Sequence, residues 1–321
     1  KFRRPADLWT PSYEVPMGPS LLWVYEGMTE YLGVVLTSRS GLWSPELTRD
    51  ILARSAANYE LGRAGRKWRN LQDTTQQPIV NYRGRQSYDS WQRSKDYYTE
   101  GIFVWLDVDT KIRELTRGKR SLDDFARAFY GVEDGRIEPL TYTFEDVVAA
   151  LNAVTPHDWA SLLRSRLDGH GPGAPLDGLA RGGWRLAFRD EPSPSVKEAD
   201  SADSTWNFLY SLGVILGKDG KVGEVFWDSV AFKAGVAPGM TIVAVNGKAY
   251  THDRLRDALK AAKADPKLPT ELLVRRADSF STISLDYHAG LRYPHLERIE
   301  KTPDLLSSIL QPRLPMPAVK K

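Results

Sequence analysis

Residues 21–36 read LLWVYEGMTEYLGVVL, a largely apolar stretch with the acidic residue Glu26 near its middle. Apolar residues such as Leu22 and Leu32 recur near the 3.6-residue period of a helix. We therefore expect one buried or half-buried helix here, with Ser20 as its N-cap. An unpaired carboxylate in such a helix costs several kcal/mol or takes up a proton. Glu26 should then meet a cation, a set of hydrogen-bond donors or a metal.

Gly27 follows this carboxylate directly. A glycine costs a helix about 1 kcal/mol relative to alanine, so its presence predicts that another part of the chain approaches the backbone there. The alternative interpretation of Glu26 stays open: it is a helix carboxylate paired with an arginine or lysine.

The pattern Trp23-x-x-Glu26-Gly27-x-Thr29-x-Tyr31 resembles the helix that supplies the glutamate zinc ligand in aminopeptidases of the HExxH-plus-Glu type. It is similar to the glycyl aminopeptidase family, in which a thermolysin-like catalytic domain is joined to a C-terminal PDZ domain. By this resemblance, Glu26 is the metal ligand.

The first five residues, KFRRP, resemble the basic segment that follows the HExxH helix in that family. We therefore expect the chain to begin just after that helix, without the two histidine ligands and the catalytic glutamate. The chain's own histidines are not spaced three or four residues apart, so they cannot form a two-histidine zinc helix. They are His157, His170, His252, His288 and His295.

The length and composition limit which classes of protein this chain can belong to. A length of 321 residues predicts two domains. With 44 basic and 41 acidic side chains, the net charge of +3 gives no sign of a nucleic-acid surface. We expect the basic clusters at 63–69 and 113–120 to be solvated helix ends. The absence of cysteine excludes disulfides and fits either cytoplasm or periplasm, so the localisation stays unknown. No apolar run reaches the roughly 18 residues of a membrane span.

Residues 40–168 are expected to form a helical region. The predicted helix starts are Ser44 before a proline, Ser121 and Thr143 with an aspartate three residues later, and Thr155 before a proline. Residues 66–88 have few periodic apolar positions and are expected to be a wall loop of the active-site cleft.

The stretch Tyr97-Tyr98-Thr99-Glu100-Gly101 opens another predicted helix and resembles the Y-Y-x-K-G motif of the glycyl aminopeptidase family. In that family a tyrosine hydroxyl near zinc stabilises the oxyanion of the tetrahedral intermediate. The resemblance assigns this role to Tyr98, although the family's lysine is replaced here by Glu100. A neutral phenol can donate to a developing negative charge. Packing alone is the alternative role for both tyrosines.

From residue 206 the pattern predicts strands, with runs at 209–216, 222–226, 239–245, 271–275 and 282–287. Asp219-Gly220 is a type I′ turn signal, Asn246-Gly247 predicts a turn, and residues 251–263 predict a helix. The segment 229–247 resembles a PDZ domain. By that resemblance Ser211, Leu212, Gly213 and Val214 form a carboxylate-binding loop that captures a peptide C-terminus by strand addition. The alternative is a PDZ unit that packs on the catalytic domain and binds nothing.

The predicted fold class is a multidomain α+β protein: the α-helical C-terminal part of a thermolysin-like metallopeptidase domain, followed by a PDZ-like β-rich domain. Its parts are the helical peptidase region (1–183), a strand and exposed linker (184–204), the PDZ-like domain (205–290) and a C-terminal tail that returns to the body (291–321).

By resemblance, the function is that of the C-terminal portion of a zinc aminopeptidase releasing N-terminal Gly or Ala from peptides. The intact parent protein is expected to bind zinc. This fragment is expected to bind none tightly and to be inactive alone. Glu30 shares the helix face of Glu26 and is either a partner of a metal ligand or part of a surface ion pair. The expected partners are peptide substrates, peptide C-termini and the N-terminal part of the same protein. The alternative function is a non-catalytic PDZ peptide-binding or scaffold protein.

Overall fold

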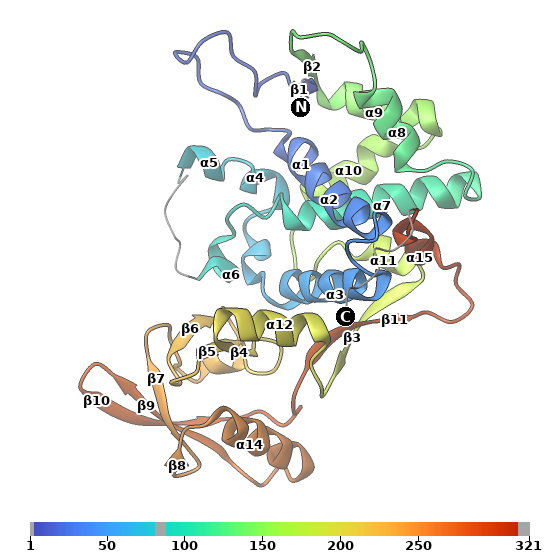
Figure 1. Cartoon of the computed structure of the whole chain (residues 1–321). Helices are drawn as coiled ribbons and strands as arrows, with labels where there is room; N and C mark the ends of the chain where they lie inside the picture. Colours follow the sequence, from blue (N-terminus) through green and yellow to red (C-terminus); the bar gives the residue numbers. More distant parts are fainter. Residues whose placement is uncertain (1–2, 81–87, 314–321) are drawn as a thin grey trace.

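The computed structural model describes residues 3–80 and 88–313. Figure 1 shows a helical part at the top and a β-rich part below it. The helical part holds a parallel pair, β1 (Arg3–Pro5) and β2 (Leu140–Tyr142), and the helices α1 (Leu22–Tyr25), α2 (Gly27–Arg39), α3 (Pro45–Leu61), η1 (Ala64–Lys67), α4 (Leu71–Thr74), α5 (Gln77–Val80), α6 (Asp89–Gln92), α7 (Thr99–Thr116), α8 (Leu122–Tyr130), α9 (Phe144–Val154), α10 (Trp159–Leu167) and α11 (Asp177–Arg181).

Two antiparallel sheets form the β-rich part, with strand orders β4-β5-β6 and β10-β9-β7-β8. Its elements are β4 (Thr205–Phe208), β5 (Val214–Gly217), β6 (Val222–Val225), α13 (Val230–Lys233), β7 (Thr241–Val245), β8 (Lys248–Ala249), α14 (His252–Ala264), β9 (Thr270–Arg276) and β10 (Ser279–Leu285). The predicted helix at 251–263 is confirmed, and its apolar residues Leu255, Leu259 and Ala262 are buried. The protein is therefore a mixed helix and sheet fold, as predicted.

Helix α7 is the centre of the helical core. Its residues are buried along most of its length, and α2 and α11 pack against it. The Trp105 ring stacks on Trp23 with centroids 5.6 Å apart, and its Nε1–H donates to the Trp23 carbonyl at 2.9 Å. These contacts tie the start of α1 to the middle of α7.

The chain crosses back to the helical part after the β-rich part. Strand β3 (Trp184–Arg189) pairs antiparallel with β11 (Tyr293–Arg298), and α15 (Leu305–Leu310) then buries Leu306, Ile309 and Leu310 in the helical core. Arg39 Nε donates to the Ile309 carbonyl at 2.8 Å. The predicted return of the C-terminal tail is thus confirmed as far as residue 313.

The predicted single helix over 21–36 is interrupted at Glu26, where α1 ends and α2 begins. Hydrogen bonds continue across the break, from Glu26 N–H to Leu22 O at 2.8 Å and from Glu30 N–H to Glu26 O at 2.9 Å. The predicted N-cap was wrong: Leu21 occupies that position, and the Ser20 N–H donates to Asp7 Oδ2.

Most predicted helix starts are confirmed. At each of them the side chain of the predicted cap accepts a hydrogen bond from a backbone N–H two or three residues later. Ser44 accepts from Leu47 N–H, and Ser121 and Thr143 both form capping boxes. Thr155 was wrong as an N-cap. Asp158 caps α10 instead and accepts from Ser161 N–H at 3.0 Å.

Two segments predicted to be irregular are ordered. Residues 190–204 were expected to be exposed, but α12 (Pro194–Asp203) forms there and buries Val196 against the β-rich core. Residues 66–80 of the predicted wall loop include η1, α4 and α5, while 81–87 lie outside the described residues. The Asp219-Gly220 turn is not type I′, since Gly220 has φ +79° and Asp219 has no positive φ.

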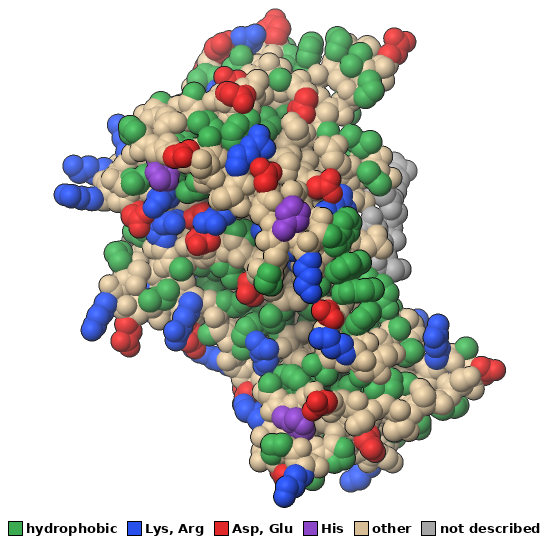
Figure 2. All heavy atoms as spheres, turned by 180° about the vertical axis from the view of Figure 1, so that it is seen from behind, with side chains coloured by type: hydrophobic (Ala, Val, Ile, Leu, Met, Phe, Trp, Pro, Cys, Tyr) green, Lys and Arg blue, Asp and Glu red, His purple; other side chains and the backbone are tan. Residues whose placement is uncertain are grey.

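Charged side chains of both signs are mixed over the face in Figure 2, in agreement with the small net charge. Within residues 3–80 and 88–313, no helix is both long enough and apolar enough to cross a membrane.

Candidate functional site

Glu26 lies half-buried at the junction of α1 and α2, where it is the N-cap residue of the longer helix. Tyr98 occupies the N-cap position of α7 and is also half-buried. Its ring packs on the buried ring of Tyr97, with centroids 4.7 Å apart. Both predicted residues therefore stand at the N-terminal ends of the two helices that cross in the core.

A glycine pair brings the two helix ends together. A Cβ atom at Gly27 would lie 2.7 Å from the Tyr97 carbonyl oxygen, and one at Gly101 would lie 2.7 Å from the Gly27 Cα. The predicted backbone approach at Gly27 is thus confirmed, and the approaching segment is the first turn of α7. Glu26 is next to Gly27, and Tyr98 lies between Tyr97 and Gly101. The crossing therefore brings the backbones at these two residues into one region.

Glu30 is exposed one turn further along α2. Its predicted role as a partner of a metal ligand stays a prediction. Among the described residues, no group of three or more His, Asp or Glu side chains is close enough to hold a metal ion. Glu26 therefore fits zinc only as one ligand of a set whose other members are not among the described residues.

The basic cluster at 63–69 was predicted to be solvated, and this was wrong. Arg66 and Arg69 are only 7% and 8% exposed. Arg66 Nη1 donates to Glu100 Oε1, Arg69 Nε donates to Asp73 Oδ2 at 2.7 Å and Arg63 Nε donates to Asp96 Oδ1 at 3.1 Å. Spacing could predict only the Arg69–Asp73 pair, whose members lie four residues apart. Asp96 lies just before α7 and Glu100 in its first turn, so only the fold brings them to Arg63 and Arg66.

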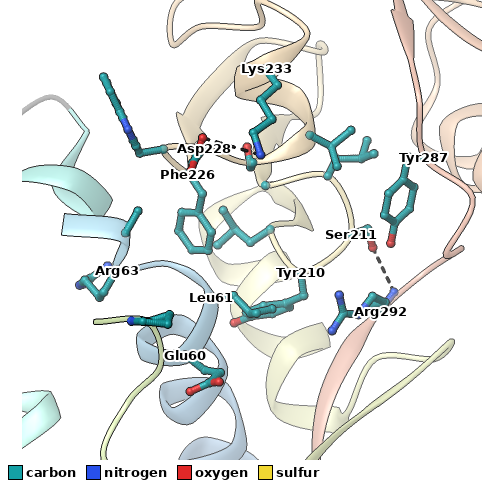
Figure 3. Close-up of a pocket in the computed structure, with 18 of the residues that line it drawn as sticks. Glu60, Leu61, Arg63, Tyr210, Ser211, Phe226, Asp228, Lys233, Tyr287 and Arg292 are labelled. Atoms are coloured by element: carbon teal, nitrogen blue, oxygen red, sulfur yellow. Dashed lines mark hydrogen bonds and ion pairs between the residues drawn. The ribbon is translucent and has the colours of Figure 1, made fainter. Parts of the chain in front are cut away.

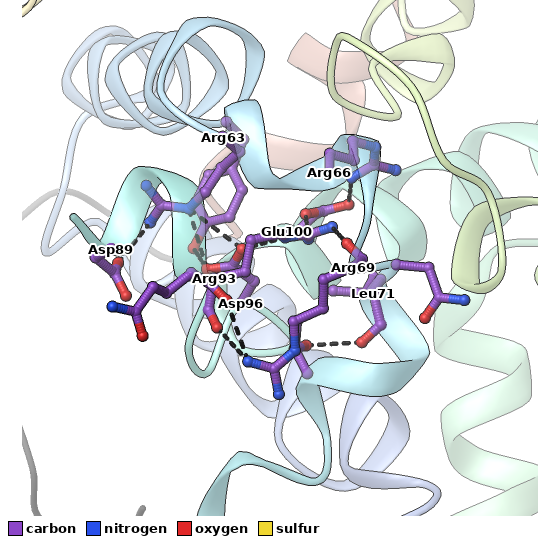
Figure 4. A network of polar contacts seen from close by, with 12 residues as sticks. Arg63, Arg66, Arg69, Leu71, Asp89, Arg93, Asp96 and Glu100 are labelled. Carbon is purple, nitrogen blue, oxygen red and sulfur yellow. Dashed lines mark hydrogen bonds and ion pairs between the residues drawn. The ribbon is translucent and has the colours of Figure 1, made fainter. Parts of the chain in front are cut away.

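Arg93 completes this network (Figure 4). Its side chain is fully buried; Nε donates to Asp96 Oδ2 at 2.7 Å and Nη2 donates to Glu100 Oε2. Burial raises the pKa of the Asp96 carboxyl, but Arg63 and Arg93 outweigh it and hold that pKa below its usual value. The carboxylate is therefore ionised at neutral pH.

The predicted carboxylate-binding loop is buried. The N–H groups of Ser211, Leu212 and Gly213 all donate to the Phe208 carbonyl, at 3.2, 2.8 and 3.0 Å. Val214 is the first residue of β5, and it pairs with Phe208 of β4 in an antiparallel ladder. The chain's own β4 thus occupies the edge of β5 at which a peptide would add.

A pocket of about 400 Å³ lies beside this loop, between the end of α3 and the β-rich part (Figure 3). Ser211 Oγ accepts from the Arg292 N–H at its wall. Asp228 pairs with Lys67 at 3.5 Å and with Lys233 at 3.7 Å. Three of the charged side chains that line the pocket are therefore paired with one another.

The M61 glycyl aminopeptidase family matches residues 1–104, a stretch that contains Glu26, Tyr98 and Glu100. The match confirms the resemblance predicted from the sequence. No curated protein matches the chain.

Among solved structures, the chain is similar to an aminopeptidase N family protein from Idiomarina loihiensis, with a TM-score of 0.72 and 20% sequence identity. The match covers 97% of this chain and 52% of that one, so the chain spans about half of that protein's length. At this identity the likeness concerns the fold alone. The HtrA3 PDZ domain bound to a phage-derived ligand matches at 21% identity over 36% of this chain and 91% of that domain, but its TM-score is only 0.18.

Proposed function

Because the chain carries the M61 glycyl aminopeptidase pattern over residues 1–104, we propose that it is the C-terminal portion of a zinc-dependent aminopeptidase. In this proposal the enzyme releases an N-terminal Gly or Ala, and the remaining zinc ligands come from an HExxH segment ahead of Lys1. Glu26 supplies one ligand, and zinc, when bound, acts as a Lewis acid on the substrate carbonyl.

The contact between Gly27 and Gly101 carries this proposal. It brings the backbone beside Glu26 against the backbone of the turn that contains Tyr98, although the two lie far apart in sequence. Tyr98 can donate its O–H to the oxyanion that develops as the peptide bond is attacked. The N-terminal end of the 18-residue α7 adds a favourable positive potential at the same place.

The second candidate function belongs to the β-rich part, which we regard as PDZ-like. Its support is the Ser211–Val214 loop ahead of β5 and the presence of α14 nearby. In this alternative the protein is a non-catalytic peptide-binding or scaffold protein. The occupation of the β5 edge by β4 weighs against it.

Two measurements test the proposed enzyme. Purified 1–321 should not hydrolyse glycyl or alanyl amides, because one carboxylate is too few ligands for a catalytic zinc site. The longer protein that includes the preceding segment should hydrolyse them, and Tyr98→Phe should lower its turnover by roughly two to three powers of ten with zinc retained. Tyr97→Phe is the matched control. An active longer protein in which Tyr98→Phe keeps normal turnover contradicts the assignment of Tyr98.

A further inference from the structure

Two carboxylates flank Tyr98 at equal distance along the chain. Asp96 precedes it by two residues and Glu100 follows it by two, and their exposures are only 2% and 0%. The Glu100 N–H donates to the Asp96 carbonyl at 2.8 Å, which closes the turn that contains Tyr98. Like charges four residues apart on a helix repel each other, and a buried carboxylate needs a partner. This turn therefore depends on the cations around it.

Those cations come from two other segments. Arg93 bridges both carboxylates, while Arg63 and Arg66 bind their remaining oxygens from the region of η1. Figure 4 shows these side chains converging on Asp96 and Glu100. The turn around Tyr98 is thus held from both of its ends by the same buried network.

The backbone of Arg93 is held as firmly as its side chain. Its φ of +51° lies in the left-handed region, which a non-glycine residue keeps only when its surroundings fix it. Arg69 Nη1 donates to the Arg93 carbonyl at 2.6 Å, and Arg93 Nη1 donates back to the Arg69 carbonyl at 2.7 Å. These reciprocal bonds fix the segment that leads into the turn.

We infer that Glu100, held by Arg66 and Arg93, is a positioning residue for the Tyr98 phenol. It anchors the first turn of α7 on one side, while Gly101 presses the same turn against Gly27 on the other. The family motif has a lysine at this position, so the chain uses a different charge and its own arginine partners. This inference rests on the proposed function, because that function gives the phenol its task.

Asp107 offers a matched control on the same helix. It is also fully buried, and it binds Arg166 at 2.9 Å and Arg181 of α11. These pairs hold α10 and α11 against α7, away from the Tyr98 turn. Asp107→Asn and Glu100→Gln therefore remove the same charge from two equally buried carboxylates, each bound by two arginines, and only the second change acts on Tyr98.

The test is ¹⁹F NMR of the chain 1–321 labelled with 3-fluorotyrosine, with the Tyr98 resonance assigned by its loss in Tyr98→Phe. Glu100→Gln should shift and broaden the Tyr98 resonance, whereas Asp107→Asn should leave it at the wild-type position. An unchanged resonance in Glu100→Gln, or an equal change in both variants, would overturn the inference. If Glu100→Gln does not fold, Arg66→Gln, which removes one of the two partners, must give the same shift.

A second measurement separates this inference from the proposed function. In the longer, active protein, Glu100→Gln should lower kcat with little change in KM, and it should have no further effect in a Tyr98→Phe background. If Tyr98→Phe leaves kcat unchanged while the NMR shift is present, the role that the proposed function gives to Tyr98 fails, and the positioning of its phenol by Glu100 stands. An equal loss of kcat from Glu100→Gln in both backgrounds contradicts the positioning role.

Discussion

Asp200, in α12, is a carboxylate whose surroundings oppose its ionisation. It is partly buried between this helix and β4, and its Oδ2 accepts from the Asn207 N–H at 3.3 Å. Burial raises the pKa of Asp200 to about 6, and the Asn207 hydrogen bond and Arg54 offset only part of that effect. At neutral pH the folded protein therefore contains a carboxylate that would be more stable in water.

The sign of the resulting pH dependence follows from linkage. An unfolded aspartate has a pKa near 3.9, so between about pH 4 and 6 the folded chain binds a proton that the unfolded chain has lost, and this contribution to stability falls as pH rises. Asp200→Asn should thus raise the urea midpoint more at pH 7.5 than at pH 4.5. Glu198→Gln, on the exposed side of the same helix, is the control. An equal change from Asp200→Asn at both pH values would contradict the assigned pKa.

At the scale of secondary-structure elements, the crossing of α2 and α7 depends on two glycines that face each other. Helix α2 contains a second glycine, Gly33, whose added Cβ would meet nothing within 4 Å. The same helix therefore provides one glycine that the packing requires and one that it does not.

Gly27→Ala should lower the free energy of unfolding by about 1–3 kcal/mol, as extra atoms do in a packed core. Gly33→Ala should raise it by about 0.5–1 kcal/mol, because alanine is the better helix former and the space is open. Chemical denaturation of both variants measures these changes. If Gly27→Ala were as stable as Gly33→Ala, the close crossing would be wrong.

Strand β4 is the element that decides whether the β-rich part can bind peptides. Strand β4 pairs with the edge of β5, and its Phe208 carbonyl accepts hydrogen bonds from three N–H groups of the 211–213 loop. The Trp206 ring of β4 stacks on His252 of α14, with centroids 3.8 Å apart. These are the contacts that an added peptide strand would need. The fold thus favours the alternative in which this unit is structural.

A titration with C-terminal peptides tests this reading. Fluorescence polarisation with a library of labelled peptides ending in apolar residues should detect no carboxylate-dependent binding to the full chain. Peptides amidated at the C-terminus serve as the matched control. Binding by free-acid peptides that is lost on amidation would show that β4 leaves the edge and that the loop N–H groups are accessible.

At the scale of the whole molecule, the features that could be predicted are those encoded locally. Ser44, Ser121 and Thr143 predict the starts of their helices because the backbone N–H that donates to each capping side chain lies within three residues of it. The strands β6, β7, β9 and β10 and the helix at 252–264 follow from short hydrophobic periods. The strand predicted at 209–216 was wrong over most of its length, because residues 209–213 form a turn and β5 begins only at Val214. Gly27 predicts that another segment approaches the helix backbone closely, but nothing near it in the sequence identifies that segment as α7.

The features that could not be predicted depend on contacts between distant segments. The side chains at 63–69 have the composition of a solvated helix end, and only the fold brings Asp96 and Glu100 to them. In the same way, the polar composition of residues 194–203 does not predict α12, whose Val196 is buried in the core of the β-rich part. The grouping of Glu26 with Tyr98 came from a family resemblance, since spacing alone cannot relate residues on different helices.

The zinc content of Glu26→Gln tests the account most directly. We would measure zinc by plasma mass spectrometry in the longer protein that carries the HExxH segment ahead of Lys1. Glu46→Gln, which removes an exposed carboxylate paired with Arg49, is the control. The account predicts about one zinc ion per chain in the wild type and in Glu46→Gln, and a clear loss of zinc in Glu26→Gln. Full zinc content and normal peptidase activity in Glu26→Gln would contradict it.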